Sequence, residues 1–312
     1  MSDAAMNPFG RIALAAGGDS AEREISLRSG RAVAQALDEL KLDYVWLDGA
    51  ESVIEAALAG RIDRVLNMLH GRGGEDGCLQ GAMKLLGVPM TGSNTTGSAI
   101  AMDKLQTKRL WQACDLPTPD WRTAESAGQA ELILKELPTP LFVKPVREGS
   151  SVGMTRIERQ EQLEPAIARA LEHDRMALVE QLIDGAEYTA AVLNEQALPL
   201  IRIETPREFY DYDAKYQAGD TTYHCPCSLP AEKEAELQQL AMNAFEVLGC
   251  SGWGRVDFML DQSSQPWLLE ANTVPGMTNH SLVPMAAKAA GMDFRQLVQR
   301  ILQTSVSDEV RQ

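Results

Sequence analysis

Residues 254–278 read GRVDFMLDQSSQPWLLEANTVPGMT, in which two apolar runs flank a short polar segment. Residues 255–260 and 267–272 have the length and composition of strands, and the polar residues 261–265 between them are typical of a turn. The stretch therefore predicts two paired strands. The turn-rich loop that follows, residues 273–278, leaves backbone N–H groups free to bind an anion.

Successive side chains of a strand point to opposite faces, so the polar residues of this pair share a face. Arg255 and Asp257 lie on one face of the first strand, and Glu270 and Asn272 lie together on the second. The positions expected to face the core are Val256, Phe258, Leu269 and Ala271. Two carboxylates and an amide suit Mg²⁺, which often completes its shell with water and nucleotide phosphates. The alternative is an exposed face that carries only a salt bridge.

A second candidate site lies in residues 143–153, which read VKPVREGSSVG. Lys144 is expected on a strand beside a flexible Gly/Ser loop, where a lysine charge and backbone N–H donors together can bind phosphate. The spacing does not match GxxxxGK[ST], so a Walker-type P-loop is disfavoured. Because Gly/Ser turns are common, an ordinary turn is the alternative.

The first third of the chain alternates strands and helices. Apolar runs at residues 11–16, 44–47 and 64–69 predict strands, and their order with the intervening helices predicts a parallel α/β domain that ends near residue 103. His70 opens a glycine-rich loop at the end of the third run, where ligands bind in open α/β sheets, although a lone histidine is more often structural.

The loop after the first strand favours a cation. Gly17 and Gly18 are adjacent and do not give the GxGxxG spacing of a dinucleotide site. Asp19 and Glu22 would repel a pyrophosphate, whereas a substrate ammonium would suit them. The alternative is that Ser20 or Asp19 only caps the following helix.

Composition excludes several classes of protein. The chain has 312 residues, a net charge of −15 and a pI near 4.8, which argues against a general nucleic-acid binder. No apolar run approaches the ~18 residues of a membrane span, and no secretory signal is visible, so we expect a cytoplasmic protein without a membrane partner. Five irregularly spaced cysteines predict reduced thiols, and the four histidines form no zinc motif.

Residues 206–228 form a long polar stretch rich in tyrosine and without periodicity. A loop of this length in a compact protein is more often a functional lid than a simple connection. Tyr212 and Tyr216 could pack within this loop or close over a ligand.

Seven motifs in this order resemble the D-alanine–D-alanine ligase family over residues 11–302. The motifs are GG-SAE at 17–22, HG-GGEDG at 70–77, MDK at 102–104, VKP-EGSSVG at 143–153, YDY-KY at 210–216, GRVD at 254–257 and LEAN-PGMT at 269–278. The resemblance implies an α/β fold of the three-domain ATP-grasp type with an N-terminal parallel α/β domain. It implies domains at residues 1–103, 104–186 and 187–312, with ATP between the last two.

The resemblance also implies a site for ATP and metal. Glu180 would meet the adenine–ribose region with Ile183 nearby, and Glu187 would accept the ribose hydroxyls. The residues expected near the phosphates are Lys104, Lys144, Ser151 in the Ser150–Val152 loop, and Lys215. The ligands expected for two Mg²⁺ ions, for which Mn²⁺ can substitute, are Asp257, Glu270 and Asn272.

By the same resemblance, one D-alanine attacks the ATP γ-phosphate to give an acyl phosphate, and a second D-alanine amine attacks that carbonyl. Arg255 and the Gly276 N–H would stabilise the oxyanion. Glu22, with His70 beside it, would pair with the first ammonium. Glu22, Ser150 and Tyr216 would form a hydrogen-bonded link between the substrate and the lid. Ser281 and the backbone of Leu282 would hold the carboxylate of the second D-alanine. The product would serve peptidoglycan precursor synthesis, and the family is expected to form homodimers.

Three other interpretations remain open. A nicotinamide oxidoreductase would use the first domain, but the glycine spacing and acidic residues argue against it. A non-enzymatic amino-acid sensor would not explain Asp257, Glu270 and Asn272 beside Arg255. Within the family, relatives that make D-alanyl-D-lactate carry histidine in the lid, so Tyr216 favours an amine acceptor, with His224 as a reservation.

Overall fold

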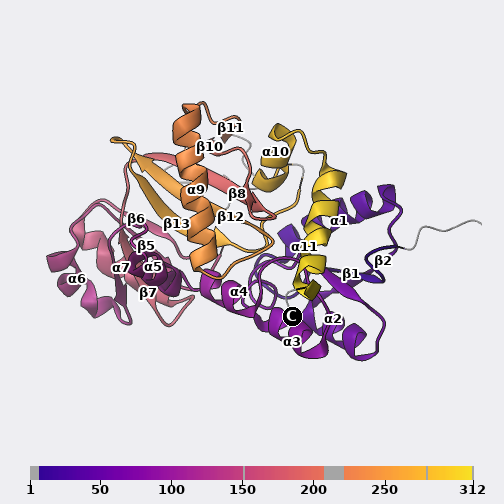
Figure 1. Cartoon of the computed structure of the whole chain (residues 1–312). Helices are drawn as coiled ribbons and strands as arrows, with labels where there is room; N and C mark the ends of the chain where they lie inside the picture. The colour runs from indigo at the N-terminus through magenta and orange to yellow at the C-terminus, as the bar shows by residue number, and fades with distance from the viewer. Residues whose placement is uncertain (1–6, 150–151, 207–220, 279, 311–312) are drawn as a thin grey trace, which may run out of the picture.

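The structure is a computed structural model that describes residues 7–149, 152–206, 221–278 and 280–310. Three sheets make up its framework: three parallel strands, four antiparallel strands and six antiparallel strands. Figure 1 shows the four-stranded sheet on the left, the largest sheet in the middle and the parallel sheet on the right. In the described part of the chain, no helix combines the length and apolarity needed to cross a membrane.

The N-terminal sheet confirms the predicted parallel arrangement, with strand order β2-β1-β3. Its elements are β1 (Ile12–Ala16), α1 (Arg23–Glu39), β2 (Tyr44–Asp48), α2 (Gly49–Leu58), β3 (Arg64–Asn67), α3 (Cys78–Leu86) and α4 (Thr95–Met102). Every residue of β1 is buried because helices cover both faces of the sheet, which explains its unbroken apolar sequence. Ile12 and Leu14 pack into one hydrophobic cluster, whereas Ala13 and Ala15 pack into another with α2 and α3.

The four-stranded sheet has the order β4-β7-β5-β6. Its part of the chain contains α5 (Lys104–Ala113), β4 (Trp121–Ala124), the 3₁₀ turn η1 (Ala127–Gln129), α6 (Ala130–Glu136), β5 (Leu141–Pro145), β6 (Thr155–Ile157), the 3₁₀ turn η2 (Gln160–Gln162), α7 (Leu163–Leu171) and β7 (Ala177–Gln181). Val143 and Val179 pack with α6 and α7 in one cluster. Because side chains alternate along a strand, Lys144 and Glu180 lie on the opposite face, away from these helices.

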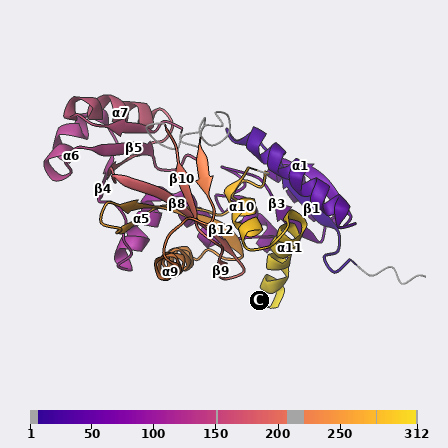
Figure 2. The ribbon, with the colours of Figure 1, turned by 90° about the horizontal axis from the view of Figure 1, so that it is seen from above.

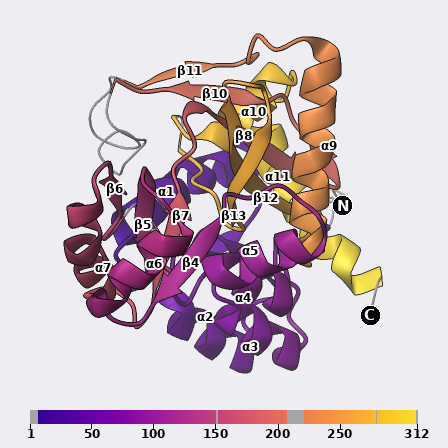
Figure 3. The same cartoon turned by 90° about the vertical axis from the view of Figure 1, so that its left-hand side faces the viewer.

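The largest sheet has the order β11-β10-β8-β12-β13, with β9 paired to β8. Its elements are β8 (Gly185–Leu193), β9 (Gln196–Ala197), β10 (Ile201–Glu204), β11 (Thr222–His224), α9 (Ala231–Val247), β12 (Trp253–Asp261) and β13 (Pro266–Asn272). Helix α9 packs on one face through Leu237 and Phe245, which share a cluster with Val256 and Phe258. Figure 3 shows α9 standing beside these strands.

The last two helices return to the N-terminal sheet. They are α10 (Leu282–Ala289) and α11 (Phe294–Val310). Leu297, Val298 and Ile301 of α11 share a cluster with β1 and α1, and Arg64 of β3 donates to Ser305 Oγ at 2.6 Å. Figure 2 shows α11 beside β1 and β3. Chain segments far apart in sequence therefore share one core, and the domain boundaries expected from the resemblance stay a prediction.

Neighbouring residues of α6 provide a test of the core of the four-stranded sheet. Ile133 is buried (5% exposed), whereas Leu132 is 58% exposed. Ile133→Ala should destabilise the protein by about 2–5 kcal/mol because it removes packed methyl groups and leaves a cavity. Leu132→Ala should change stability by no more than about 0.5 kcal/mol. Thermal unfolding of both variants checks this, and equal melting temperatures would contradict the packing.

Candidate active site

The predicted strand pair is present as β12 and β13, which run antiparallel and side by side. Arg255 lies opposite Asn272, and Asp257 lies opposite Glu270. The four polar side chains inferred from the two-residue period of the strands therefore belong to adjacent positions. This confirms the predicted gathering of two carboxylates, an amide and a guanidinium.

One predicted core position is wrong. The register of β12 and β13 shifts between Asp257 and Phe258, so Phe258 pairs with Leu268. A β-bulge of this kind inserts one extra residue in one strand and reverses the inside–outside alternation beyond it. Leu268 is therefore fully buried, whereas Leu269 is half-buried and lines a cavity.

Asp257 contacts two other members of the group and one residue of β8. Its carboxylate forms two contacts with Arg255, of 2.8 and 2.7 Å, and accepts hydrogen bonds from Asn272 Nδ2 at 3.1 Å and from Thr189 Oγ1 at 2.6 Å. The side chain is buried, so these donors fix its orientation. Thr189 was missed in the sequence because it belongs to β8 and only the pairing of β8 with β12 brings it here.

The donor set fits a hard divalent cation. Asp257, Glu270 and Asn272 offer carboxylate and amide oxygens from facing strands, the ligand type that Mg²⁺ prefers. Within the described residues, no group of three His, Cys, Asp or Glu side chains could hold a metal ion. A metal here would therefore need oxygen ligands from water or phosphate, as Mg²⁺ commonly has at nucleotide sites.

A cavity of about 710 Å³ lies between the four-stranded and six-stranded sheets. Its size is that of a pocket for a nucleotide-sized ligand. It is lined by seven of the predicted site residues, which are Lys104, Lys144, Glu180, Ile183, Glu187, Asp257 and Glu270. The structure thus brings together these seven of the residues expected to meet the nucleotide and the metal, whereas Asn272 lines the smaller cavity described below.

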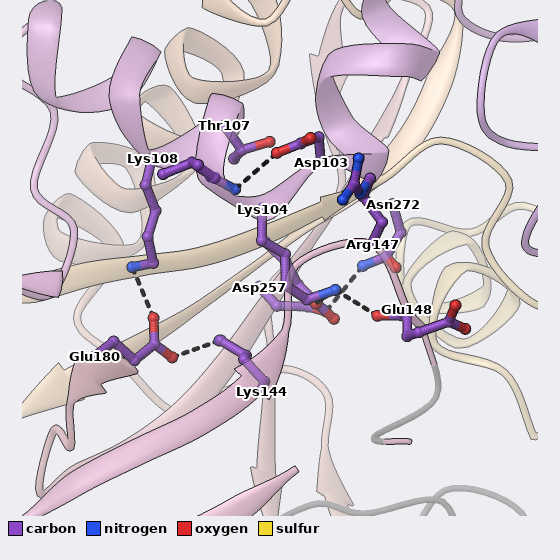
Figure 4. Close-up of polar contacts among 12 residues, drawn as sticks. Asp103, Lys104, Thr107, Lys108, Lys144, Arg147, Glu148, Glu180, Asp257 and Asn272 are labelled. Atoms are coloured by element: carbon purple, nitrogen blue, oxygen red, sulfur yellow. Dashed lines mark hydrogen bonds and ion pairs between the residues drawn. The ribbon is translucent and has the colours of Figure 1, made fainter. Parts of the chain in front are cut away.

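The floor of this cavity contains a buried charge cluster. Glu180 forms ion pairs with Lys144 through one carboxylate oxygen and with Lys108 through the other, the latter at 2.8 Å (Figure 4). Burial raises the pKa of Glu180, but the charges of the two lysines outweigh it and lower that pKa below its ordinary value. Lys108 was missed in the sequence. The sequence feature that could have identified it is its position on α5, at helical spacing from the buried residues Leu105 and Trp111.

A second, smaller cavity of about 70 Å³ lies between the N-terminal domain loops and β13. The predicted residues that line it are Glu22, His70, Lys104, Arg255, Glu270, Asn272 and Gly276. Gly71 and Gly149 approach the Glu22 carboxylate so closely that a Cβ on either would lie within 2.9 Å of it. The lack of a side chain at these two positions therefore leaves room for the Glu22 carboxylate.

The two cavities adjoin. Lys104, Glu148, Gly149 and Glu270 line both of them. Lys104 Nζ donates to the Glu148 carbonyl oxygen at 2.7 Å (Figure 4). The same Nζ lies 3.6 Å from Glu270 Oε2. A phosphate in the larger cavity and a small molecule in the smaller one would therefore share the same charged boundary.

Burial and charge set the protonation of the smaller cavity. Burial lowers the pKa of the His70 imidazole, helped by Arg255 and opposed by Glu22. The ring lies 3.2 Å from Ser29 Oγ, and Ser20 Oγ donates to the His70 carbonyl at 2.7 Å. Ser20 thus ties two loops together, whereas the N-cap of α1 is Glu22, so the alternative that Ser20 or Asp19 caps this helix is wrong.

Glu75 is a further residue that sequence reasoning left without a role, although it lies in the glycine-rich loop after His70. Its carboxylate accepts from the N–H of Gly71 at 2.6 Å and from the N–H of Val274 at 3.1 Å. Burial, and then the charge of Glu22, raise its pKa to about 8 despite these two hydrogen bonds. Glu75 links the N-terminal loop to the loop that follows β13.

The remaining predicted residues fall into two groups. Ser281 and Leu282 are at the start of α10, where Ser281 Oγ accepts from the N–H of Thr278 at 2.9 Å, close to Gly276. Ser150, Ser151, Lys215 and Tyr216 lie outside the described residues, as does most of the predicted lid. In the described part of the predicted lid, His224 lies on the edge strand β11, 3.0 Å from Glu204.

The raised pKa of Glu75 predicts how stability depends on pH. The folded state binds this proton more tightly than the unfolded chain, so the protonated carboxyl contributes stability below about pH 4.5 that is lost as pH rises through about 8. Glu75→Gln removes this dependence, so the melting temperature of the variant, relative to that of wild type, should increase between pH 5 and pH 9. The matched control is the exposed Glu246→Gln, and a difference independent of pH would contradict the assignment.

Known proteins resemble this chain over nearly its full length. The family model described as D-ala D-ala ligase C-terminus matches residues 110–303. A D-alanine–D-alanine ligase of Methylococcus capsulatus is 53% identical over 297 residues, which cover 95% of this chain and 96% of that relative.

Solved structures agree with these matches. The D-alanine–D-alanine ligase of Bacillus anthracis has a TM-score of 0.86 and 34% identity, covering 97% of this chain and 99% of the other, and it has also been solved with ATP. The D-Ala:D-Ser ligase of Enterococcus faecalis has a TM-score of 0.81 and 32% identity, with 95% and 99% covered. On the strength of these similarities over the sheets and cavities described above, the chain belongs to the D-alanine–D-alanine ligase family and has its ATP-grasp fold.

Proposed function

We propose that this protein uses ATP to join two D-alanine molecules into D-alanyl-D-alanine, for peptidoglycan precursor synthesis. The observation that carries this proposal is the shared boundary of the two cavities, formed by Lys104, Glu148, Gly149 and Glu270. A nucleotide in the larger cavity would direct its terminal phosphate toward an amino-acid carboxylate in the smaller one. Such an arrangement suits phosphoryl transfer, which depends mainly on position and charge.

In the nucleotide cavity, Glu180 would meet the adenine and ribose with Ile183 nearby, and Glu187 would accept the ribose hydroxyls. The residues proposed for the phosphates are Lys104, Lys144, Ser151 and Lys215. Asp257, Glu270 and Asn272 would hold two Mg²⁺ ions, for which Mn²⁺ would substitute. Bound metal would neutralise the negative charge that phosphates bring to these carboxylates.

In the smaller cavity, Glu22 would pair with the ammonium of the first D-alanine, with His70 beside it. A carboxylate oxygen of this D-alanine would attack the γ-phosphate, which forms an acyl phosphate and displaces ADP. The amine of the second D-alanine would then attack the activated carbonyl, and phosphate would leave. Arg255 and the Gly276 N–H would stabilise the tetrahedral oxyanion because both groups lie in the cavity wall.

The second D-alanine would be held through its carboxylate by Ser281 and the backbone of Leu282. Ser281 supports this role because it stands beside Gly276 at the start of α10, where helix N–H groups favour an anion. A hydrogen-bonded link of Glu22, Ser150 and Tyr216 would connect the substrate to the lid. Tyr216 favours an amine acceptor over D-lactate, and the contact of His224 with Glu204 gives that histidine a partner on the sheet edge.

Two further parts of the proposal concern the protein as a whole. A homodimer is proposed from the family, and Leu58 of α2 and Leu85 of α3, 69% and 90% exposed, provide apolar surface that a second copy could cover. Light scattering of the purified protein would give its mass in solution.

A cytoplasmic location is supported by the five cysteines, all of which are free thiols.

The activity is tested by incubating the full-length protein with ATP, Mg²⁺ and D-alanine and by identifying the product by mass. We expect D-alanyl-D-alanine with one phosphate released per dipeptide, because both come from one acyl phosphate. EDTA should abolish turnover, and excess Mg²⁺ or Mn²⁺ should restore it. In parallel reactions, D-lactate or D-serine replaces part of the D-alanine.

If D-alanyl-D-lactate or D-alanyl-D-serine formed in preference to D-alanyl-D-alanine, the acceptor would be D-lactate or D-serine instead of a second D-alanine. Phosphate release without any ligated product, or no turnover with all three acceptors, would contradict the proposed ligation.

A further inference from the structure

Lys108 is a buried charge that none of the roles above uses. Its side chain is fully buried, and Nζ lies 2.8 Å from Glu180 Oε2. Nζ also donates to Thr118 Oγ1 at 2.7 Å, and that hydroxyl donates to the Leu268 carbonyl at 2.9 Å. These contacts anchor Lys108 to β13 on one side and to the nucleotide cavity, through Glu180, on the other.

Lys108 stands behind Glu180 as seen from the cavity. Glu180 and Lys144 line the cavity, whereas Lys108 is absent from the described residues that line it. Figure 4 shows Glu180 between the two lysines, with Lys108 descending from α5 and Lys144 on β5. A nucleotide in the cavity would therefore contact Lys144 and Glu180. Lys108 would act on it only through these two residues and through the electrostatic effect of the Lys108 charge.

The charges in this cluster explain what a second lysine adds. Lys144 and Glu180 alone would form a neutral pair, and the attraction of Lys144 for phosphate would be largely cancelled. With Lys108 charged, the cluster carries a net charge of +1 in a site where burial weakens screening. Burial lowers the pKa of Lys108 to about 8, with Glu180 opposing that effect, so the ammonium form prevails at neutral pH.

Stability alone does not account for a lysine here. A buried ion pair is often no more stabilising than apolar side chains of similar volume, because both charges lose their hydration. Leu105 and Trp111, three residues before and after Lys108, are buried apolar side chains, while Lys104 and Thr107 are the other buried residues of α5, so apolar side chains are accommodated next to this position. A functional requirement for charge is the simpler explanation.

We propose that Lys108 is a positioning residue for the nucleotide, which holds the Glu180 carboxylate in place and offsets its charge so that Lys144 can attract the phosphates of ATP. This inference rests on the proposed function, because it assumes that ATP occupies the larger cavity. It predicts that loss of the Lys108 charge weakens binding of ATP more than binding of adenosine, although the contact of Lys108 with Glu180 can also affect the nucleoside.

The test compares the affinities of the full-length protein for Mg²⁺–ATP and for adenosine by calorimetry, without D-alanine. Lys108→Met keeps the length of the side chain and removes its charge. It should lower the preference for ATP over adenosine by roughly tenfold, the order expected for one unit charge at about 10 Å and an effective dielectric constant of about 20. Lys135→Met, which removes an exposed lysine of α6, is the matched control and should leave the preference unchanged.

The double variant Lys108→Met/Glu180→Gln provides the rescue. It leaves the charge of Lys144 unopposed, so the preference for ATP should return toward the wild-type value even if both affinities fall. This variant also buries no carboxylate, which keeps the test valid if Lys108→Met alone does not fold. A double variant that stays tenfold below wild type in this preference would overturn the proposal.

Other outcomes are also decisive. Equal losses of affinity for ATP and adenosine in Lys108→Met would show a purely structural role and overturn the proposal, as would unchanged affinities for both. If wild-type protein bound ATP no better than adenosine, the proposed ATP-dependent function itself would fail, which distinguishes that failure from a wrong role for Lys108.

Discussion

The pairing of β12 with its two neighbours is the interaction on which the candidate site depends. All nine residues of β12 pair with β8, and most of them also pair with β13. This double pairing fixes Arg255 and Asp257 against the carboxylate and amide of β13, and it brings Thr189 to Asp257. Because the strand cannot slip by one residue without exposing Val256 and Phe258, the register of the core also fixes the register of the site.

Around this strand, the three sheets supply different kinds of group. The four-stranded sheet contributes Lys144 and Glu180 to the larger cavity, and the N-terminal loops contribute Glu22 and His70 to the smaller one. Lys104, at the start of α5, stands where the two cavities meet. The charges that a triphosphate and an amino acid would need are thus separated between two adjoining spaces.

The sequence was informative where periodicity and chemistry coincide. A strand period of two placed Arg255, Asp257, Glu270 and Asn272 on shared faces, and the alternating order of strands and helices predicted the parallel N-terminal sheet. Leu269 was misplaced because a bulge changes the alternation, and no local signal marks that extra residue. The order of seven motifs, rather than any one of them, predicted the family.

Lys108 and Glu75 show a second limit of prediction from sequence. Each is a titratable residue with a partner that is distant along the chain: Glu180 for Lys108, and Val274 for Glu75. The helical pattern of α5 could have flagged a lysine among buried positions, but it could not name the carboxylate that compensates the charge. Only the packing of α5 on the four-stranded sheet reveals that partner.

The central claim is that a carboxylate in the smaller cavity is phosphorylated by ATP in the larger one, and oxygen transfer tests it most directly. D-alanine labelled with ¹⁸O in both carboxylate oxygens would be incubated with unlabelled ATP and Mg²⁺, and the released phosphate analysed by mass. An acyl phosphate keeps one carboxylate oxygen on phosphorus, so this account predicts one ¹⁸O in each phosphate. Dipeptide formation with unlabelled phosphate would contradict it.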